Sequence, residues 1–153
     1  MALYVVQHGK SLPKTDDPEK GLSEEGKRET DRIAEVARGY DVPVSRIVHS
    51  GKKRALQTAE RMGAALCPDR KIQTRSGMNP LDDVGAFAAD LPLDQNIMLI
   101  GHLPFLEKLI GLLVSDDAAR TVFKLQNSGI VCLDKPADMK NAVIRWALMP
   151  NVG

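Results

Sequence analysis

Residues 3–9 constrain the fold more than any other part of this sequence. Four apolar residues, Leu3–Val6, run directly into a glutamine, His8 and Gly9. Four consecutive apolar side chains are typical of a strand that is buried on both faces, as in the middle of a parallel sheet. Ligands of open α/β sheets bind at the carboxyl ends of the strands, and glycine lets the backbone come close to a ligand. The segment therefore predicts an α/β fold with His8 at the ligand-binding edge.

The same pattern occurs a second time near residue 100. The segment Asn96–Ile100 is again mostly apolar, and Gly101 and His102 follow it. Pro104 suits the first turn of a helix that begins directly afterwards. Two buried strands are thus expected to bring His8 and His102 to one edge of the sheet.

An arginine is expected at the same edge. The segment Arg46–Ser50 has the pattern of a short strand, and a helix with an alanine-rich face follows it at about residues 52–66. Arg54 then lies in the first turn of that helix, where backbone amides favour phosphate and a guanidinium adds a bidentate donor. We interpret Lys52 and Lys53 as a solvated basic face.

The remaining pattern completes an alternation of strands and helices. Ser23 and the two glutamates after it predict the start of a helix that ends near Gly39. The connection of residues 76–95 is expected to hold one short helix at about residues 84–91. Further strands are expected at Lys71–Arg75, Phe123–Leu125, Gly129–Leu133 and Ala142–Met149, the last of them near the sheet edge.

Composition limits the classes to which this chain can belong. Its 153 residues, 43% of them hydrophobic, suit one domain that spans residues 1–153. The 21 basic and 20 acidic residues nearly cancel, which argues against binding to nucleic acid or to an anionic membrane surface. Cys67 and Cys132 lack metal-ligand or redox spacing, and no apolar run approaches the ~20 residues of a membrane span. We therefore expect a cytoplasmic protein.

The three converging side chains favour phosphoryl transfer. Two histidines and an arginine without a third ligand form a poor metal site, and no serine or cysteine has the setting of an activated nucleophile. A neutral imidazole can instead attack phosphorus while cationic donors hold the phosphoryl oxygens. The set His8, Arg54 and His102 thus predicts a site for phosphate or another oxyanion, with no metal and no cofactor.

Taken in order, the motifs around these residues resemble those of the histidine phosphatase superfamily, with its phosphoglycerate-mutase-like fold. The matching segments are Gln7-His8-Gly9, Leu22-Ser23-x-x-Gly26, Ser50–Glu60 and Gly101-His102-Leu103-Pro104. They are most similar to the small branch of phosphohistidine phosphatases. The resemblance implies a three-layer α/β sandwich, in which a mixed, mainly parallel six-stranded sheet has helices on both faces.

The resemblance also implies roles for individual residues. His8 would be the nucleophile that becomes phosphorylated, while Arg54 and His102 would bind phosphate and stabilise the transition state. Gln7 and Gly9 would help to bind the phosphate.

Four other polar residues have a functional and a structural interpretation. Asn127 and Ser128 precede a late strand, where they either reach the phosphate or are turn residues. Asp83, with its neighbour Asp82, is the candidate acid that protonates a leaving group, and the alternative is a helix cap. Phosphohistidine needs less help from such an acid, because imidazole leaves more readily than an alkoxide. His49 is expected to satisfy a local hydrogen bond.

One position departs seriously from the family pattern. The family reads Arg-His-Gly, and this chain has Gln7 in place of the arginine. A glutamine amide can still donate to a phosphate oxygen but carries no charge, and loss of one preorganised donor typically costs ~10²–10³ in rate. Lys10 either compensates for the missing positive charge or is an exposed loop lysine. The second interpretation is favoured, because the ammonium of lysine does not form the paired hydrogen bonds of a guanidinium. Gln7 therefore predicts a slow enzyme.

The sequence thus predicts a metal-independent phosphatase that acts on the phosphohistidine of a signalling protein through a phosphorylated His8. The connections of residues 9–22 and 76–95, 14 and 20 residues long, are too short for a large lid. An open site gains little binding energy from a small metabolite but admits a side chain of another protein. Two alternatives stay open: a phosphate- or phosphohistidine-binding pseudoenzyme, which would explain Gln7, and a small-molecule phosphomonoesterase or mutase.

Overall fold

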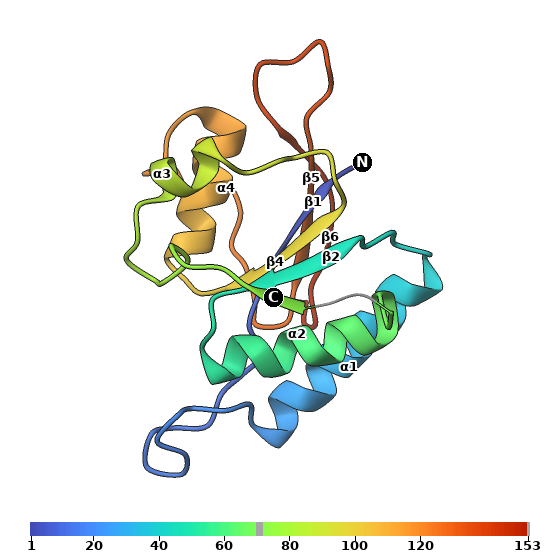
Figure 1. Cartoon of the computed structure of the whole chain (residues 1–153), viewed down its shortest axis with the longest axis vertical. Coiled ribbons are helices and arrows are strands. Elements are labelled where there is room, and N and C mark those ends of the chain that lie inside the picture. The colour runs from blue at the N-terminus through green and yellow to red at the C-terminus, as the bar shows by residue number, and fades with distance from the viewer. Residues whose placement is uncertain (70–71, 153) are drawn as a thin grey trace.

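The computed structural model describes residues 1–69 and 72–152, which form a six-stranded sheet covered by helices on both faces (Figure 1). The strands are β1 (Leu3–Gln7), β2 (Arg46–His49), β3 (Ile72–Thr74), β4 (Ile97–Gly101), β5 (Ile130–Asp134) and β6 (Val143–Leu148). The helices are α1 (Glu24–Gly39), α2 (Lys53–Leu66), α3 (Val84–Ala89) and α4 (Phe105–Ser115). Strands and helices alternate along the chain as far as α4, as predicted.

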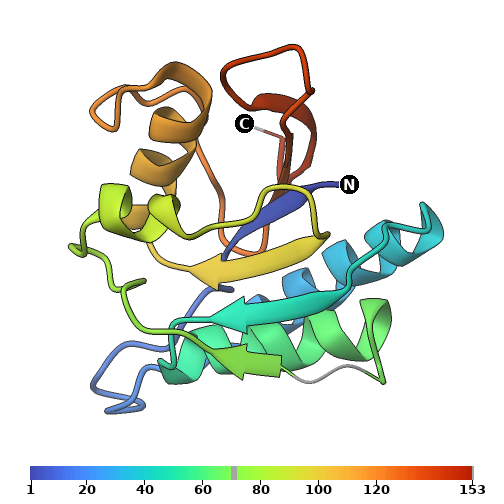
Figure 2. The same cartoon turned by 45° about the horizontal axis from the view of Figure 1, so that its top comes forward.

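The sheet is mixed and mainly parallel. Its strand order is β3-β2-β4-β1-β5-β6. β1 pairs with β4, and β2 with both β3 and β4, in parallel, whereas β5 runs antiparallel to β1 and to β6. Figure 2 shows the arrows of β2, β3 and β4 pointing the same way, so that their carboxyl ends lie at one edge. The predicted layers and the position of β6 at the sheet edge are both confirmed.

The two central strands, β1 and β4, are buried on both faces. Tyr4 and Val6 of β1 lie in the core beneath α1 and α2, whereas Leu3 and Val5 lie in the core beneath α3 and α4. The residues of β4 alternate between the same two cores. This burial on both sides explains why each strand is apolar at successive positions rather than at every second one.

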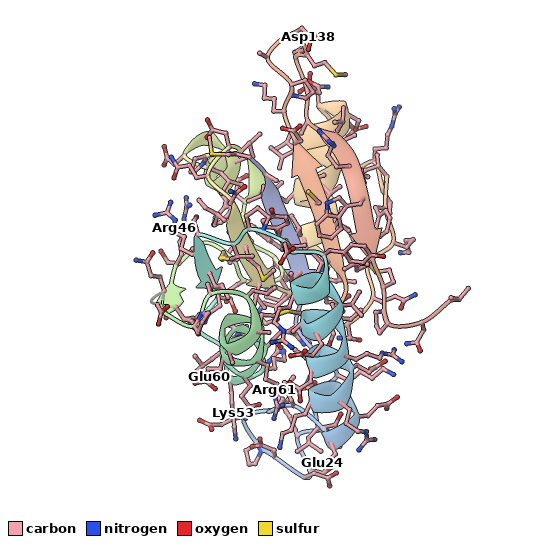
Figure 3. The ribbon with its side chains drawn as sticks, turned by 90° about the vertical axis from the view of Figure 1, so that its right-hand side faces the viewer. Glu24, Arg46, Lys53, Glu60, Arg61 and Asp138 are labelled. Carbon is pink, nitrogen blue, oxygen red and sulfur yellow. The ribbon has the colours of Figure 1, made fainter. Side chains whose placement is uncertain are left out.

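Helices α1 and α2 pack against each other along one face of the sheet. Their inner faces carry buried alanines, which let the helices approach closely: Ala34, Ala37, Ala55 and Ala59. Figure 3 shows Glu60 and Arg61 on the outer side of α2, away from the sheet. Arg61 donates to Asp31 of α1 at 2.6 Å, so the charged surface also joins the two helices.

The start of α1 is fixed to the segment that follows β1. Ser23 is the N-cap, and its hydroxyl accepts a hydrogen bond from Gly26 N at 3.0 Å. The backbone of Ser23 also donates to the Lys10 carbonyl at 2.9 Å. A Cβ at Gly26 would come within 2.9 Å of the backbone carbon and nitrogen of Lys10, so only glycine allows this close approach.

Three expectations for individual elements need correction or restriction. Phe123–Leu125 is not a strand, because Leu125 N donates to the carboxylate of Glu107 at 3.1 Å and β5 already occupies the place beside β1. The short helix α3 ends at Ala89, two residues earlier than expected. Of the predicted strand Lys71–Arg75, the first residue lies outside the described residues, and β3 covers 72–74.

Among the helices of the described residues, none has the length and apolar character that a membrane crossing requires.

The contact of Gly26 with Lys10 leads to a stability prediction. Gly26→Ala should lower the free energy of unfolding by about 1–3 kcal/mol, because the new methyl group overlaps a backbone that cannot move aside. Gly39→Ala is the matched control at the other end of α1, where a Cβ would meet nothing within 4 Å. It should be neutral or raise the free energy of unfolding by up to about 1 kcal/mol. Urea denaturation measures both, and equal effects would contradict the close-approach explanation.

Candidate active site

The parallel register of β1 and β4 brings His8 and His102 together. Val6 pairs with Ile100, Gln7 pairs with Gly101, and the His8 amide continues the pattern by donating to the Gly101 carbonyl at 3.0 Å. The two imidazole rings lie 5.0 Å apart between centroids. The sequence prediction that both strands end in a histidine at one edge is therefore matched by direct contact between the rings.

Arg54 reaches the same place from the first turn of α2. Its Nε donates to His8 Nε2 at 3.3 Å. The neighbouring Lys53 turns the other way and pairs with Asp17 at 2.8 Å, while Lys52 is exposed. The N-cap of α2 has no side-chain capping bond, in contrast to α1 and α3, so no cap side chain satisfies the first amides of this helix.

The hydrogen bonds of His8 define its tautomer. Its Nδ1 lies 2.7 Å from the carbonyl oxygen of Gly9, and a carbonyl can only accept, so Nδ1 carries the proton. The other nitrogen, Nε2, is then a lone pair directed towards Arg54. Burial, countered by the bond to Gly9 and assisted by the charges of Arg54 and Lys20, lowers the pKa of His8 from 6.5 to about 4. His8 is therefore a neutral nucleophile at physiological pH.

His102 is nearly fully buried, at 1% exposure. Its Nε2 forms a 2.6 Å hydrogen bond with the hydroxyl of Ser50, the residue that follows β2. Burial first, and then the nearby His8, Arg54 and Lys52, lower the pKa of His102 to about 3. Both imidazole rings are therefore neutral, and the charged guanidinium of Arg54 lies beside them.

Three side-chain hydroxyl groups and one amide hold the turn after β1. The Gly9 amide donates to Thr58 Oγ1 at 2.9 Å, and this hydroxyl donates to the Arg54 carbonyl at 2.8 Å. Thr30 and Ser128 share a 2.7 Å hydrogen bond, and a Cβ at Gly9 would lie 2.8 Å from Thr30 Oγ1. Gln57 accepts from the Leu22 amide at 2.6 Å. These contacts orient the backbone on which the histidine sits.

Thr58 and Gln57 lie within the matching segment Ser50–Glu60, whereas Thr30 lies in none of the matching segments. Their positions on helices gave no sign that they would bond to a distant turn. The signal that existed was indirect, since polar residues on the inner, otherwise apolar faces of α1 and α2 require a buried partner.

The sequence model of the histidine phosphatase superfamily (branch 1) matches residues 3–82, which is more than half of the chain. The chain belongs to this superfamily. It is 26% identical to phosphohistidine phosphatase SixA of Escherichia coli (strain K12), over 98% of this chain and 94% of that protein. The superfamily and its small phosphohistidine phosphatase branch, expected from the motifs, are thereby confirmed.

Solved structures agree with this assignment at the level of the fold. The protein histidine phosphatase SixA complexed with tungstate superimposes with a TM-score of 0.83 at 24% identity, covering 98% of this chain and 97% of that one. A phosphoserine phosphatase mutant of Entamoeba histolytica in complex with phosphoserine has a TM-score of 0.73 at 15% identity, with 95% of each chain covered. The phosphoglycerate-mutase-like fold is confirmed.

Gln7, the departure from the superfamily pattern, ends β1 beside a hollow of about 390 Å³. The hollow is lined by Gln7, Lys10, Leu103, Leu125, Gln126, Asn127 and Asn151. The Oε1 atom of Gln7 is buried and has no hydrogen-bond partner among the described residues. Lys10 does not take the place of the missing charge here, because its Nζ pairs with Glu25 at 2.8 Å and with Glu29 at 3.3 Å.

The residues before β5 hold the end of β1 through its carbonyl groups. Asn127 donates from Nδ2 to the His8 carbonyl at 2.8 Å, and Ser128 donates from its amide to the Gln7 carbonyl at 2.9 Å. The Ser128 side chain is fully buried against Thr30. These are bonds that a turn uses to fix a neighbouring strand, and phosphate binding by Ser128 stays a prediction.

Asp83 and His49 make the contacts of structural residues. The Asp83 carboxylate caps α3 by accepting from Gly85 N at 2.8 Å and Ala86 N at 3.3 Å. It lines a separate hollow of about 470 Å³ together with Arg75, Ser76, Gly77, Asp82, Ala86 and Phe87. His49 accepts from Gly51 N at 3.0 Å, the local bond that was expected. In residues 1–69 and 72–152, no cluster of three or more histidine, cysteine or acidic side chains is arranged to hold a metal ion.

The lowered pKa of His8 leads to a prediction about pH. Because its folded value of about 4 lies below the unfolded 6.5, the His8 ring signals in ¹H–¹³C NMR should stay constant between pH 7 and pH 5. Below pH 6.5 the His8 ring takes up a proton in the unfolded chain but not in the folded protein. The contribution of His8 to the free energy of unfolding should therefore be largest above pH 6.5 and fall as the pH falls towards 4. The signal is assigned by its loss in His8→Ala. A titration midpoint near 6.5 would contradict the buried, neutral site.

Proposed function

We propose that this protein is a phosphohistidine phosphatase that works through a phosphorylated His8. The observation that carries the proposal is the orientation of the His8 ring. Its Nδ1–H is bonded to the Gly9 carbonyl, which leaves the Nε2 lone pair beside Arg54 and His102. Its relationship to phosphohistidine phosphatase SixA, at 26% identity over nearly the whole chain, supports the same reaction.

In the first step His8 Nε2 attacks phosphorus and forms a new P–N bond while the P–N bond of the substrate breaks. Arg54, His102 and the uncapped amides at the start of α2 bind the three phosphoryl oxygens as charge spreads over them. The proton on His8 Nδ1 stays on the ring, where its hydrogen bond to the Gly9 carbonyl holds it throughout the step. The substrate phosphohistidine leaves as neutral imidazole when its second ring nitrogen carries a proton.

In the second step water attacks the phosphoryl group on His8. The P–N bond to His8 breaks, phosphate and one proton are released, and His8 returns as the neutral tautomer with which it began. Neither step requires a metal ion or an acid to protonate an alkoxide. The cap contacts of Asp83 are thus compatible with a phosphoramidate substrate, whereas a phosphoester substrate would need a leaving-group acid.

A protein is the substrate that best suits this site. The connections of residues 9–22 and 76–95 are short. The first of them is hydrogen-bonded to the start of α1 through Ser23 and to α2 through Gln57. An open site of this kind gives a small metabolite little to bind, but it admits a phosphohistidine that projects from another protein. We infer that the partner is a phosphohistidine-bearing signalling protein.

The mechanism predicts a phosphorylated enzyme intermediate. Incubation with a protein carrying ³²P-phosphohistidine should release phosphate and label the enzyme, and His8→Ala should abolish both because it removes the nucleophile. His102→Ala should slow the reaction by ~10²–10³, as is typical when one transition-state donor is lost. Circular dichroism of each variant confirms that it is folded.

Two results of that experiment would overturn the proposal. Turnover by folded His8→Ala at the original rate would exclude His8 as the nucleophile. A value of kcat/KM for phosphoserine or a sugar phosphate above that for the phosphohistidine protein would favour the small-molecule phosphomonoesterase instead.

Gln7 favours a second candidate, a pseudoenzyme that binds phosphohistidine without turning it over. If Gln7 is a weak donor in a working site, Gln7→Arg should raise kcat/KM, by up to ~10²–10³, and tighten the binding of vanadate. Gln7→Lys is the matched control, because it adds the charge without the guanidinium fork and should gain less. Wild-type protein that binds phosphate but shows no turnover, with activity appearing only in Gln7→Arg, would establish the pseudoenzyme. No gain in rate or binding would mean that the site is built around glutamine.

A further inference from the structure

Ser50 occupies a position that no step of the proposed reaction has used. It follows β2, whose last residue, His49, pairs in parallel with Ile100 of β4. The same register brings Ser50 beside His102, and its hydroxyl lies 2.6 Å from Nε2 of that ring. The short distance between two half-buried or buried groups shows a well-formed hydrogen bond.

The second partner of Ser50 is consistent with one direction of this bond. The backbone amide of Lys52 donates to Ser50 Oγ at 3.5 Å, so the hydroxyl oxygen is already an acceptor. Its own hydrogen is then free to be donated to the ring, and a donor at Ser50 makes Nε2 of His102 the acceptor. A neutral imidazole that accepts at Nε2 must carry its proton at Nδ1.

The Nδ1 atom of His102 is buried and has no hydrogen-bond partner among the described residues. Buried polar atoms in proteins are almost always satisfied, and exceptions are associated with function. A phosphoryl oxygen, which only accepts, is a matching partner for an N–H and would be repelled by a nitrogen lone pair.

We propose that Ser50 is a positioning residue that fixes His102 in the Nδ1–H tautomer, so that this neutral histidine donates from Nδ1 to a phosphoryl oxygen. The inference rests on the proposed function and deepens it. His8 and His102 then have the same tautomer but present opposite ends to the substrate. In His8, the Gly9 carbonyl accepts from Nδ1–H, so the Nε2 lone pair faces the substrate. In His102, the Ser50 hydroxyl donates to the Nε2 lone pair, so Nδ1–H faces the substrate.

The test combines a spectroscopic signature with binding and rate. In ¹⁵N NMR of the wild-type protein, His102 should show a protonated Nδ1 and an unprotonated Nε2. Ser50→Ala should shift this ring towards a mixture of tautomers, weaken the binding of inorganic phosphate and lower kcat by about 10- to 100-fold, the size of loss seen when the partner that orients a metal-binding histidine is removed. Ser50→Thr keeps the hydroxyl and should restore all three.

Ser45→Ala is the matched control, because it removes a hydroxyl from the opposite end of β2, where it bonds to the carbonyls of Gln95 and Asn96. It should leave the His102 signals, phosphate binding and rate unchanged. A wild-type His102 with its proton on Nε2 would overturn the inference even if Ser50→Ala fails to fold. Unchanged His102 signals and phosphate affinity in folded Ser50→Ala would overturn it as well.

The same measurements separate this inference from the proposed function. Wild-type protein without turnover, in which the His102 tautomer and phosphate affinity still respond to Ser50→Ala, would refute the phosphatase and retain the role of Ser50. Normal turnover by a wild-type protein whose His102 carries its proton on Nε2 would support the phosphatase and refute the role of Ser50.

Discussion

The parallel pairing of β1 with β4 is the constraint on which the site depends. Because both strands are buried on two faces, a shift of register by one residue would move every side chain into the wrong core. The register that packs the cores is also the one that sets His8 beside His102. The relative position of the two histidines is therefore fixed by hydrophobic burial in the two cores, while hydrogen bonds from Thr58 and Asn127 hold the backbone of the turn after β1.

Around this pairing, the motif residues divide into those that face the chemistry and those that hold the backbone. Arg54 faces the histidines, whereas Thr58 and Gln57, one turn further along α2, bond to backbone amides of the segment after β1. Gly26 serves the same segment by letting the Lys10 backbone approach. Much of the superfamily pattern in this chain is thus a means of orienting one turn of backbone.

The strands, helices and converging residues could be predicted because each depends on local pattern. Apolar runs that end in His8 and His102 indicate buried parallel strands, and their carboxyl ends must meet at one edge. Residues 123–125 have an apolar pattern but do not form the predicted strand. β5 occupies the edge of β1 with which they could have paired, and the Leu125 amide donates to Glu107. The hydrogen bonds of Ser50 and Asn127 could not be predicted either, because a single hydroxyl or amide group leaves no periodic pattern in the sequence that would indicate its distant partner.

The segment between Lys10 and Ser23 is closed at its base like a hairpin. Ser11 forms a bridge with Leu22, the Leu12 amide donates to the Gly21 carbonyl, and Asp17 accepts from the Gly21 amide across the tip. The closed base fixes the two ends of this loop, and Figure 1 shows the loop extending beyond the sheet. Because the entropy cost of a longer loop rises only slowly with its length, the tip is a place where evolution or design can add residues that recognise a new partner while the catalytic groups stay where they are.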